Sequence, residues 1–249
     1  MSLLGIDVGT TGCKVALFSS QGRLLAAAYE EYDVQRPQPG WAELEAAEVW
    51  ERVRRTVRRV AAGAGGDPVQ ALAVSSLGEA MVPVAADRQV LGPSILAFDA
   101  RGEEYLAHLR RGLDDERLFR ISGNTLGNHF GLTKLMWVRE HQPGLYERTY
   151  RFLPWESFVS FMLGAEPVVD YSLANRTLLF DLEREAWSPE ILAQAGLDPA
   201  KLPATAPSGT VIGTVAASAA RDLGLPAGVA IVAGAHDQCA NAVGCGVID

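Results

Sequence analysis

The 249-residue chain is 48% hydrophobic and 21% charged, a balance typical of soluble globular proteins and long enough for a sizeable core. Its net charge of -8 argues against nucleic acid or an anionic membrane as the main partner. No basic leader or apolar run of about 20 residues is present, so we expect a cytoplasmic protein. We also expect Cys13, Cys239 and Cys245 to be buried free thiols.

The first third of the chain predicts hairpins, a helix and a further strand. Residues 3–7, 14–19 and 23–31 predict successive antiparallel strands, because short turns separate segments of strand composition. Residues 45–62 carry valines at helical spacing and predict a helix whose arginines form a solvated face. Residues 69–75 predict a fourth strand. Hairpins followed by a helical crossover indicate an α/β fold with a mixed sheet covered by helices.

The remainder predicts mainly helices. Four helical segments are bounded by Gly- or Pro-containing turns: residues 102–112, 114–121, 132–141 and 155–163. Residues 168–182 predict a loop that runs into a strand, and residues 189–195 predict a short helix. The apolar run at residues 228–235 predicts a buried strand that ends at a polar cluster.

The stretch "DVGTTG", residues 7–12, joins the first two predicted strands. Its glycines let backbone N–H groups approach an anion, and a cation between Asp7 and a phosphate would offset their repulsion. The turn does not have the Walker spacing, which requires a following helix. A phosphate and Mg²⁺ site is one interpretation; a glycine-rich hairpin in which Asp7 caps its own turn is the other.

A second polar cluster, "GAHDQ", follows the last predicted strand. A carboxylate at this point, Asp237, has the chemistry of a general base. Two alternatives stay open: Asp237 caps the helix-like stretch that follows it, or the neighbouring His236 is the base.

Seven segments, in order, together resemble the first domain of the FGGY carbohydrate kinases, a family that includes glycerol, xylulose and gluconate kinases. They are "IDVGTTGCKVALF", "GWAELEAAEVW", "LAVSSLGEA", "ILAFDARG", "KLMWVREHQP", "VDYSLANRTLLFD" and "VAGAHDQCANAVGCG". The resemblance covers nearly the whole chain and is nearest to the xylulokinase- and gluconokinase-like members. It implies an actin-like, ribonuclease-H-like domain, which we expect to have a five-stranded mixed sheet with helices on both faces.

The resemblance also implies ATP-dependent phosphorylation of a ketose, polyol or sugar acid, with ATP and Mg²⁺ required. Residues 1–249 match only the sugar-binding half, so we expect the nucleotide-binding domain to be absent from this chain and the isolated chain to be inactive. Either the chain is a truncated product of a longer protein, or the nucleotide-binding half is a separate polypeptide. A homodimer of this chain is also expected as a possible partner state. Two alternatives remain: a non-catalytic sugar-binding or regulatory half-kinase, or another actin- or Hsp70-like ATPase.

The resemblance assigns roles to individual positions. Asp237 matches the base and also contacts the sugar, and Asp7 matches the acid near Mg²⁺. Phosphate and ATP contacts fall on the following residues: Gly9, Thr10, Thr11 and Lys14. Sugar contacts fall on these: Glu79, Asp99 and Arg101.

The chain departs from the xylulokinase pattern at two places. Residues 77–80 read Leu-Gly-Glu-Ala where those enzymes usually have Gln-Met-His-Gly, and Ala97 precedes Phe98 in the second sugar-facing segment. These departures argue against D-xylulose as the substrate but leave phosphoryl transfer unaffected.

Overall fold

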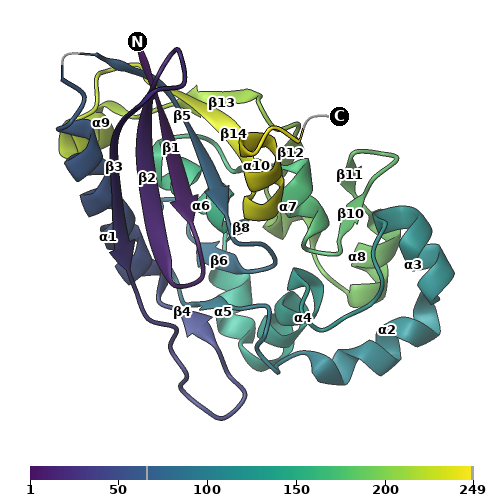
Figure 1. The fold of residues 1–249 in the computed structure, drawn as a ribbon. Helices are drawn as coiled ribbons and strands as arrows, with labels where there is room; N and C mark the ends of the chain where they lie inside the picture. Colours follow the sequence, from purple (N-terminus) through teal and green to yellow (C-terminus); the bar gives the residue numbers. More distant parts are fainter. Residues whose placement is uncertain (66, 248–249) are drawn as a thin grey trace.

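The computed structural model describes residues 1–65 and 67–247. Its centre is a six-stranded mixed sheet in the order β13-β14-β5-β1-β2-β3 (Figure 1). The strands are β1 (Ser2–Val8), β2 (Gly12–Ser19), β3 (Leu24–Glu31), β5 (Val69–Ser76), β13 (Val211–Thr214) and β14 (Ala230–His236). Strands β1, β5 and β14 are parallel, whereas β2, β3 and β13 pair antiparallel with their neighbours.

The expected count of five strands was one too low, because β13 adds to the edge of the sheet beside β14. This strand has four residues, includes Gly213, and has no buried residue. Such a strand lacks the alternation of buried and exposed side chains by which a strand is recognised in a sequence.

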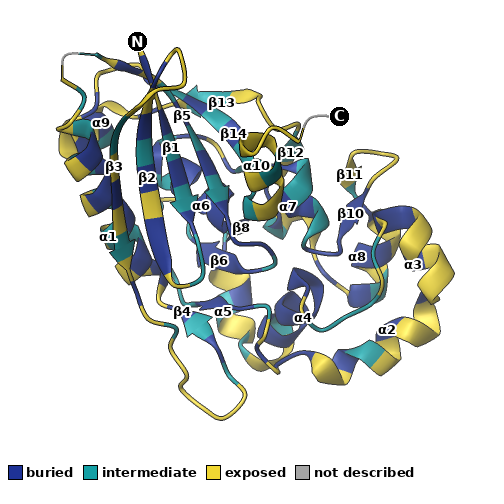
Figure 2. Ribbon diagram, in the orientation of Figure 1, coloured by how far each residue is buried: buried dark blue, intermediate teal, exposed yellow. Residues whose placement is uncertain are grey.

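Helices cover the two faces of the sheet unequally. On β1, Leu4, Ile6 and Val8 are buried on one face, where α1 (Ala46–Ala61) packs through its valines. Helices α6 (Trp155–Leu163) and α9 (Ala217–Leu223) join α1 in this core. The opposite face carries α10 (Asp237–Gly244), which has no buried residue and is drawn mostly as exposed in Figure 2. The expectation of helices on both faces is therefore confirmed.

A second hydrophobic core lies beside the sheet and is built mainly from short helices. These helices are α2 (Leu106–Gly112), α3 (Asp115–Ser122), α4 (Gly131–His141), α5 (Pro143–Arg148) and α8 (Pro189–Ala195), with 3-10 turns η1 (Glu103–Tyr105) and η2 (Pro199–Lys201). Two small antiparallel pairs connect it to the sheet: β4 (Glu43–Leu44) with β7 (Ser94–Ile95), and β6 (Met81–Val84) with β8 (Arg151–Pro154).

The segment predicted as a loop running into a strand contains more structure than expected. It forms β9 (Val168–Asp170), the helix α7 (Tyr171–Asn175) and β10 (Phe180–Asp181). β9 pairs with β12 (Ala204–Ala206), and β10 with β11 (Ala186–Trp187). The loop prediction was wrong for α7, because the Asp170 side chain caps this five-residue helix by accepting from the N–H groups of Ser172 and Leu173.

The cysteine prediction holds for one residue of three. Cys13 is a buried free thiol, and burial raises its pKa. Cys239 and Cys245 are free but exposed, because they lie on and just after α10, which buries nothing. Within the described residues, no helix has both the length and the apolar character needed to cross a bilayer.

Candidate active site

Three chain segments meet at the carboxyl ends of the parallel strands β1, β5 and β14, and we call this end of the sheet the edge. They are the turn of residues 9–11, the loop of residues 77–80 and the junction between β14 and α10. Asp7 and Ala235 both stand in register with Ser75, on opposite sides of β5. Neighbouring strands lie about 4.8 Å apart, so β1 and β14 are about 10 Å apart. The edge thus collects Asp7, Glu79 and Asp237 from distant parts of the sequence.

Asp7 points to the open face of the sheet and is half-buried. Ser75 Oγ donates to its Oδ1 at 2.8 Å, and Lys14 lies opposite it on β2. A hydrogen bond from Gly9 N to Gly12 O, 2.9 Å, and one from Tyr32 Oη to Gly9 O, 2.7 Å, fix the turn. The interpretation in which Asp7 caps its own turn is therefore wrong. Thr10 is half-buried and Thr11 is exposed.

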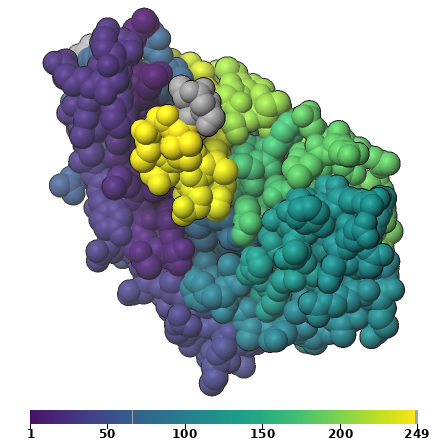
Figure 3. Space-filling model, turned by 45° about the vertical axis from the view of Figure 1, so that its right-hand side comes forward, coloured from purple at the N-terminus to yellow at the C-terminus, as the bar shows by residue number. Residues whose placement is uncertain are grey.

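Asp237 is the first residue of α10, directly after β14. The N-cap position of α10 belongs to His236, so the alternative in which Asp237 caps this helix is wrong. Its Oδ1 is shielded from solvent and lies 3.2 Å from His236 Nε2, yet accepts no hydrogen bond from the described residues. The side chain as a whole is 31% exposed. Because Oδ1 is shielded, the exposed part of this side chain is made up of its other atoms, among them Oδ2. Figure 3 shows α10 at the surface, between the N-terminal strands and the rest of the molecule.

Glu79 forms an ion pair with Arg176 that the sequence did not indicate. Arg176 Nε donates to Glu79 Oε1 at 2.6 Å, and Arg176 Nη2 donates to the same oxygen. The guanidinium also lies over the Phe130 ring, 5.0 Å from its centroid. Glu79 has φ of +63°, which is strained for a non-glycine residue and typical of functional loops. Burial and then the charge of Arg176 lower the pKa of His129 nearby.

Asp99 and Arg101 form a buried pair away from the edge. Burial would raise the pKa of Asp99, but the Arg101 side chain and the N–H groups of Ala42 and Arg101 together hold it below its usual range. Arg101 Nε donates to Asp99 Oδ1 at 2.9 Å, Nη2 to Oδ2 at 2.6 Å, and Nη1 lies 2.6 Å from Glu43 Oε1. Both carboxylate oxygens of Asp99 are therefore occupied, and the residue holds Arg101 rather than facing open solvent.

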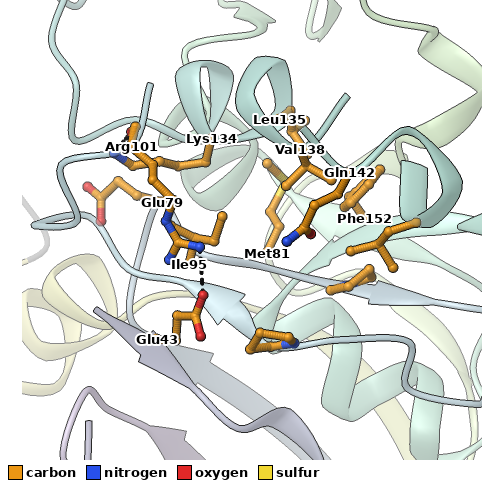
Figure 4. Close-up of a pocket in the computed structure, with 13 residues that line it drawn as sticks. Glu43, Glu79, Met81, Ile95, Arg101, Lys134, Leu135, Val138, Gln142 and Phe152 are labelled. Atoms are coloured by element: carbon orange, nitrogen blue, oxygen red, sulfur yellow. Dashed lines mark hydrogen bonds and ion pairs between the residues drawn. The ribbon is translucent and has the colours of Figure 1, made fainter. Parts of the chain in front are cut away.

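A small cavity connects this pair to the edge of the sheet. It is lined by Glu79 and Arg101 together with Glu43 and Lys134, over apolar side chains of β6, β8 and α4 (Figure 4). Lys134 Nζ donates to the carbonyls of Asp99 and Arg101, both at 2.7 Å. Burial lowers the pKa of Lys134 to about 8. Lys134 thus fixes the 99–101 segment, and Glu79 is the residue shared by the cavity and the edge.

The edge fits a magnesium ion bound through few protein ligands. Mg²⁺ usually takes one or two carboxylates and completes its shell with water and phosphate oxygens. Asp7 supplies a carboxylate of which one oxygen is held by Ser75. No cluster of three or more His, Cys, Asp or Glu side chains suited to a metal exists within residues 1–65 and 67–247. A single carboxylate such as Asp7 would suit an ion that takes most of its ligands from water and phosphate oxygens.

Sequence reasoning missed Ser75, Arg176 and Lys134. Ser75 and Lys134 sit among apolar residues of a buried strand and a buried helix, where a polar side chain usually has a specific partner. That signal was available, but their partners are 68 and 35 residues away. Only the fold reveals which residues they hold.

The strand order, the glycine turn after β1 and the acid after β14 define an actin-like, ribonuclease-H-like domain. A model of the N-terminal domain of the FGGY family of carbohydrate kinases matches residues 2–244. The chain belongs to this family.

Individual relatives agree with this assignment. The chain is 30% identical to xylulose kinase from Escherichia coli over 246 residues, which is 99% of the chain and 50% of the relative. It is 35% identical to glycerol kinase from Thermus brockianus over 219 residues, 83% of the chain and 43% of the relative. The crystal structure of xylulose kinase from Rhodospirillum rubrum superposes with a TM-score of 0.94 at 28% identity, covering 100% of the chain and 51% of that structure. The chain thus spans about half the length of these relatives.

Proposed function

We propose that this chain supplies the sugar site and the catalytic base for ATP-dependent phosphorylation of a sugar or polyol hydroxyl. A second, nucleotide-binding lobe supplies the adenosine contacts, and the two lobes make up the full-length protein. Family membership over residues 2–244 supports the reaction class. The relatives' names, xylulose kinase and glycerol kinase, support a polyhydroxyl acceptor.

The observation that carries the proposal is the state of Asp237. Its side chain is partly exposed and lies beside His236 at the same edge as Asp7 and the glycine turn. In the reaction the acceptor hydroxyl oxygen attacks the γ-phosphorus, its proton passes to Asp237, and the bond from the γ-phosphorus to the β–γ bridging oxygen breaks to release ADP. A general base in this role typically contributes about 10²- to 10⁴-fold in rate.

The other assigned residues handle the phosphate. The N–H groups of Thr10 and Thr11 bind the γ-phosphate, and Gly9, whose own N–H donates to Gly12 O, lets the backbone approach it. Lys14 balances charge beside Asp7. Asp7 would hold Mg²⁺, which neutralises charge on the phosphates when bound. These assignments follow from positions at the edge and from the anion-binding character of a turn with successive N–H groups.

The charges at the edge favour a neutral acceptor over a sugar acid. Arg176, the cation facing the loop of residues 77–80, is already paired with Glu79. Binding a substrate carboxylate would require breaking this pair, whereas neutral hydroxyls can donate to Glu79 and Asp237 without disturbing it. Buried polar groups left unpaired discriminate strongly between substrates. We therefore propose a ketose or polyol as the acceptor, held by Glu79 with Arg101 behind it.

An acceptor screen with the full-length protein tests this function. Ketoses, polyols and aldonates would be incubated with ATP and Mg²⁺, and sugar phosphates would be detected by mass spectrometry. The expected result is a phosphorylated neutral acceptor, with no product from Asp237→Asn as the control for contaminating kinases. ATP hydrolysis without any phosphorylated acceptor would contradict the proposal, and phosphorylation of aldonates alone would contradict the acceptor class.

A further inference from the structure

Strand β14 is irregular just before it delivers Asp237. Its register with β5 shifts by one residue between Val232 and Ala235, which is the signature of a β-bulge. Gly234 lies at this bulge, and a Cβ there would stand 1.8 Å from Val74 O, so only glycine fits. Bulges leave one backbone group outside the ladder and change the direction of the residues that follow.

The Gly234 N–H, which the bulge leaves outside the ladder, donates a hydrogen bond to a buried acid. Gly234 N donates to Glu156 Oε1 at 3.1 Å, and the Glu156 side chain, on α6, is fully buried. The backbone N–H of Glu156 in turn donates to Ser76 Oγ, 3.1 Å, at the end of β5. Glu156 Oε2 is buried and has no hydrogen-bond partner among the described residues. Glu156 therefore links α6 to the ends of two strands of the site.

A second buried acid holds the next residues of the same strand. Ser172 Oγ donates to Asp170 Oδ2 at 2.6 Å and accepts from His236 N at 2.8 Å. Asp170 is fully buried and also caps α7. Through the Ser172 hydroxyl, Asp170 thus constrains the backbone of His236, the residue directly before Asp237.

We propose that Glu156 and Asp170 are positioning residues that fix the junction of β14 and α10 and so aim Asp237 at the acceptor. The inference rests on the proposed role of Asp237 as base. Glu156 acts through the Gly234 N–H at the bulge, and Asp170 acts through Ser172 on the His236 N–H. Neither acid touches the acceptor or the phosphates.

Glu156 performs this role as a neutral carboxylic acid at neutral pH. Burial, and then the charge of Asp170, raise its pKa to about 8. Burial likewise raises the pKa of Asp170, against the hydrogen bonds that it accepts from Ser172, Leu173 and Ser208. The groups that face the Glu156 carboxyl group from the adjoining elements are the Asp170 carboxylate and the backbone N–H groups of Gly234 and Asp170. Above pH 8, a second negative charge beside Asp170 would loosen the junction.

The first test follows individual amides, which do not depend on activity. Hydrogen exchange of the Gly234 and His236 amides would be measured by NMR in wild type, Glu156→Ala, Glu156→Gln and Ser172→Ala. We expect Gly234 to exchange at least tenfold faster in Glu156→Ala and His236 to do so in Ser172→Ala, while Ile6 in the sheet stays protected. Ser160→Ala, which removes a buried unpartnered hydroxyl from the same helix, is the matched control and should match wild type. Unchanged exchange at Gly234 and His236 would overturn the proposal.

The second test separates kcat from KM in the full-length protein, with Asp237→Asn measured alongside. We expect Glu156→Ala and Ser172→Ala to lower kcat tenfold or more with the acceptor KM within about twofold. Glu156→Gln, which keeps the acceptor oxygen and stays neutral, should restore kcat at pH 7 and remove the decline above pH 8. Should Glu156→Ala fail to fold, Ser172→Ala and Glu156→Gln carry the same test.

The outcomes separate the two proposals. Wild-type kcat in Glu156→Ala and Ser172→Ala, with kcat lost in Asp237→Asn, would overturn the positioning role and leave the base in place. Wild-type kcat in Asp237→Asn would overturn the base and the positioning role together. A Glu156→Gln variant as impaired as Glu156→Ala would also overturn the neutral-acceptor role.

Discussion

Two aspartates in this chain illustrate how partners decide what a carboxylate does. Asp99 has both oxygens engaged, by Arg101 and by the Ala42 N–H, and is 1% exposed. Asp237 has a shielded oxygen that accepts no hydrogen bond from the described residues. The first is stabilised as an anion that fixes its neighbour, and the second lies beside His236 with part of its side chain exposed. The same residue type in the sequence therefore has a structural role at one position and a proposed chemical role at the other.

Asp7 provides a prediction at the residue scale. In the full-length protein, Asp7→Ala should lower kcat by tenfold or more and raise the Mg²⁺ concentration needed for half-maximal rate, because it removes the carboxylate assigned to the ion. Ser75→Ala, which removes only the hydroxyl that orients Asp7, should have a smaller effect on both. The rate would be measured across a Mg²⁺ titration. An Asp7→Ala protein with the wild-type Mg²⁺ requirement and rate would reduce Asp7 to a turn residue.

Glu156 gives a second residue-scale prediction, on stability. Its pKa is raised in the folded state from 4.5 to about 8, so the folded protein binds more protons than the unfolded chain between these values. The stability that the group contributes is fully present below pH 4.5 and is lost as the pH rises through 8. The free energy of unfolding of Glu156→Gln minus that of wild type should therefore rise by up to about 1.4 kcal/mol per pH unit between pH 5 and 8. Urea unfolding at pH 5, 6.5 and 8 measures this difference, and a constant difference would exclude the shift.

Some residues of the candidate site could be found from the sequence and others could not. Asp237 and Asp7 could be singled out because each follows or ends an apolar run beside small residues. The pairing of Glu79 with Arg176 could not, because 97 positions separate the two and neither lies in a regular pattern. Glu156 was not singled out, although it is the one charged residue of a helix that buries nearly all its residues, and what it holds depends on the bulge in β14.

At the scale of elements, the bulge in β14 explains how this strand, which buries two of its seven residues, ends on a partly exposed acid. Regular pairing would carry residues 235–237 straight along β5, whereas the extra residue at 233–234 displaces them. The chain then turns directly into α10, whose first residue is Asp237. Site geometry in this protein thus depends on a local departure from the sheet.

Gly234→Ala tests the importance of the bulge. Its Cβ would overlap the Val74 carbonyl, which belongs to the central strand and cannot move aside cheaply. We expect a loss of about 2–4 kcal/mol in the free energy of unfolding, in the range of overpacked buried sites. Gly144→Ala on α5, where a Cβ meets nothing within 4 Å, is the control and should be neutral or slightly stabilising. Chemical denaturation of both variants provides the comparison; equal stabilities would show that β14 can be regular.

Elements with strong periodic patterns were predictable. The first three strands, α1 and β5 follow from alternation and valine spacing within one or two residues of the observed ends. The sheet edge strand β13 and the helix α7 were not, because each has only four or five residues and depends on neighbours for its hydrogen bonds. Short elements that complete a fold are specified by tertiary contacts rather than by local sequence.

At the scale of the whole molecule, two separate hydrophobic cores adjoin the candidate site, one containing Leu77 and Ala80 and the other containing Met81. One lies under the sheet and the other among the short helices, and the loop that bears Glu79 passes between them. The site is therefore supported by both cores but open on the face where α10 lies. In the proposal, that open side is where the nucleotide lobe meets the sugar site.

This arrangement predicts the behaviour of residues 1–249 alone. They should fold cooperatively and bind a neutral polyol weakly, but show no appreciable sugar phosphorylation. Holding the acceptor, the γ-phosphate and the base together can contribute about 7–11 kcal/mol to lowering the barrier. In the proposal, this requires the half of the cleft that the nucleotide-binding lobe supplies. Calorimetry with polyols and a coupled assay for ADP measure the two properties. Efficient phosphorylation by residues 1–249 alone would mean that the cleft is completed in another way, such as by a second copy of the chain.

The central claim is that this chain carries the base of a carbohydrate kinase, and the steady-state kinetics of Asp237→Asn in the full-length protein test it most directly. The substitution keeps the shape of the side chain and removes its ability to accept the hydroxyl proton. We predict that kcat falls by about 10²-fold or more, while the acceptor KM changes by less than about threefold. His236→Asn, the matched change one residue earlier, should leave kcat within about tenfold of wild type. An Asp237→Asn enzyme with wild-type kcat, or a loss confined to His236→Asn, would contradict the account.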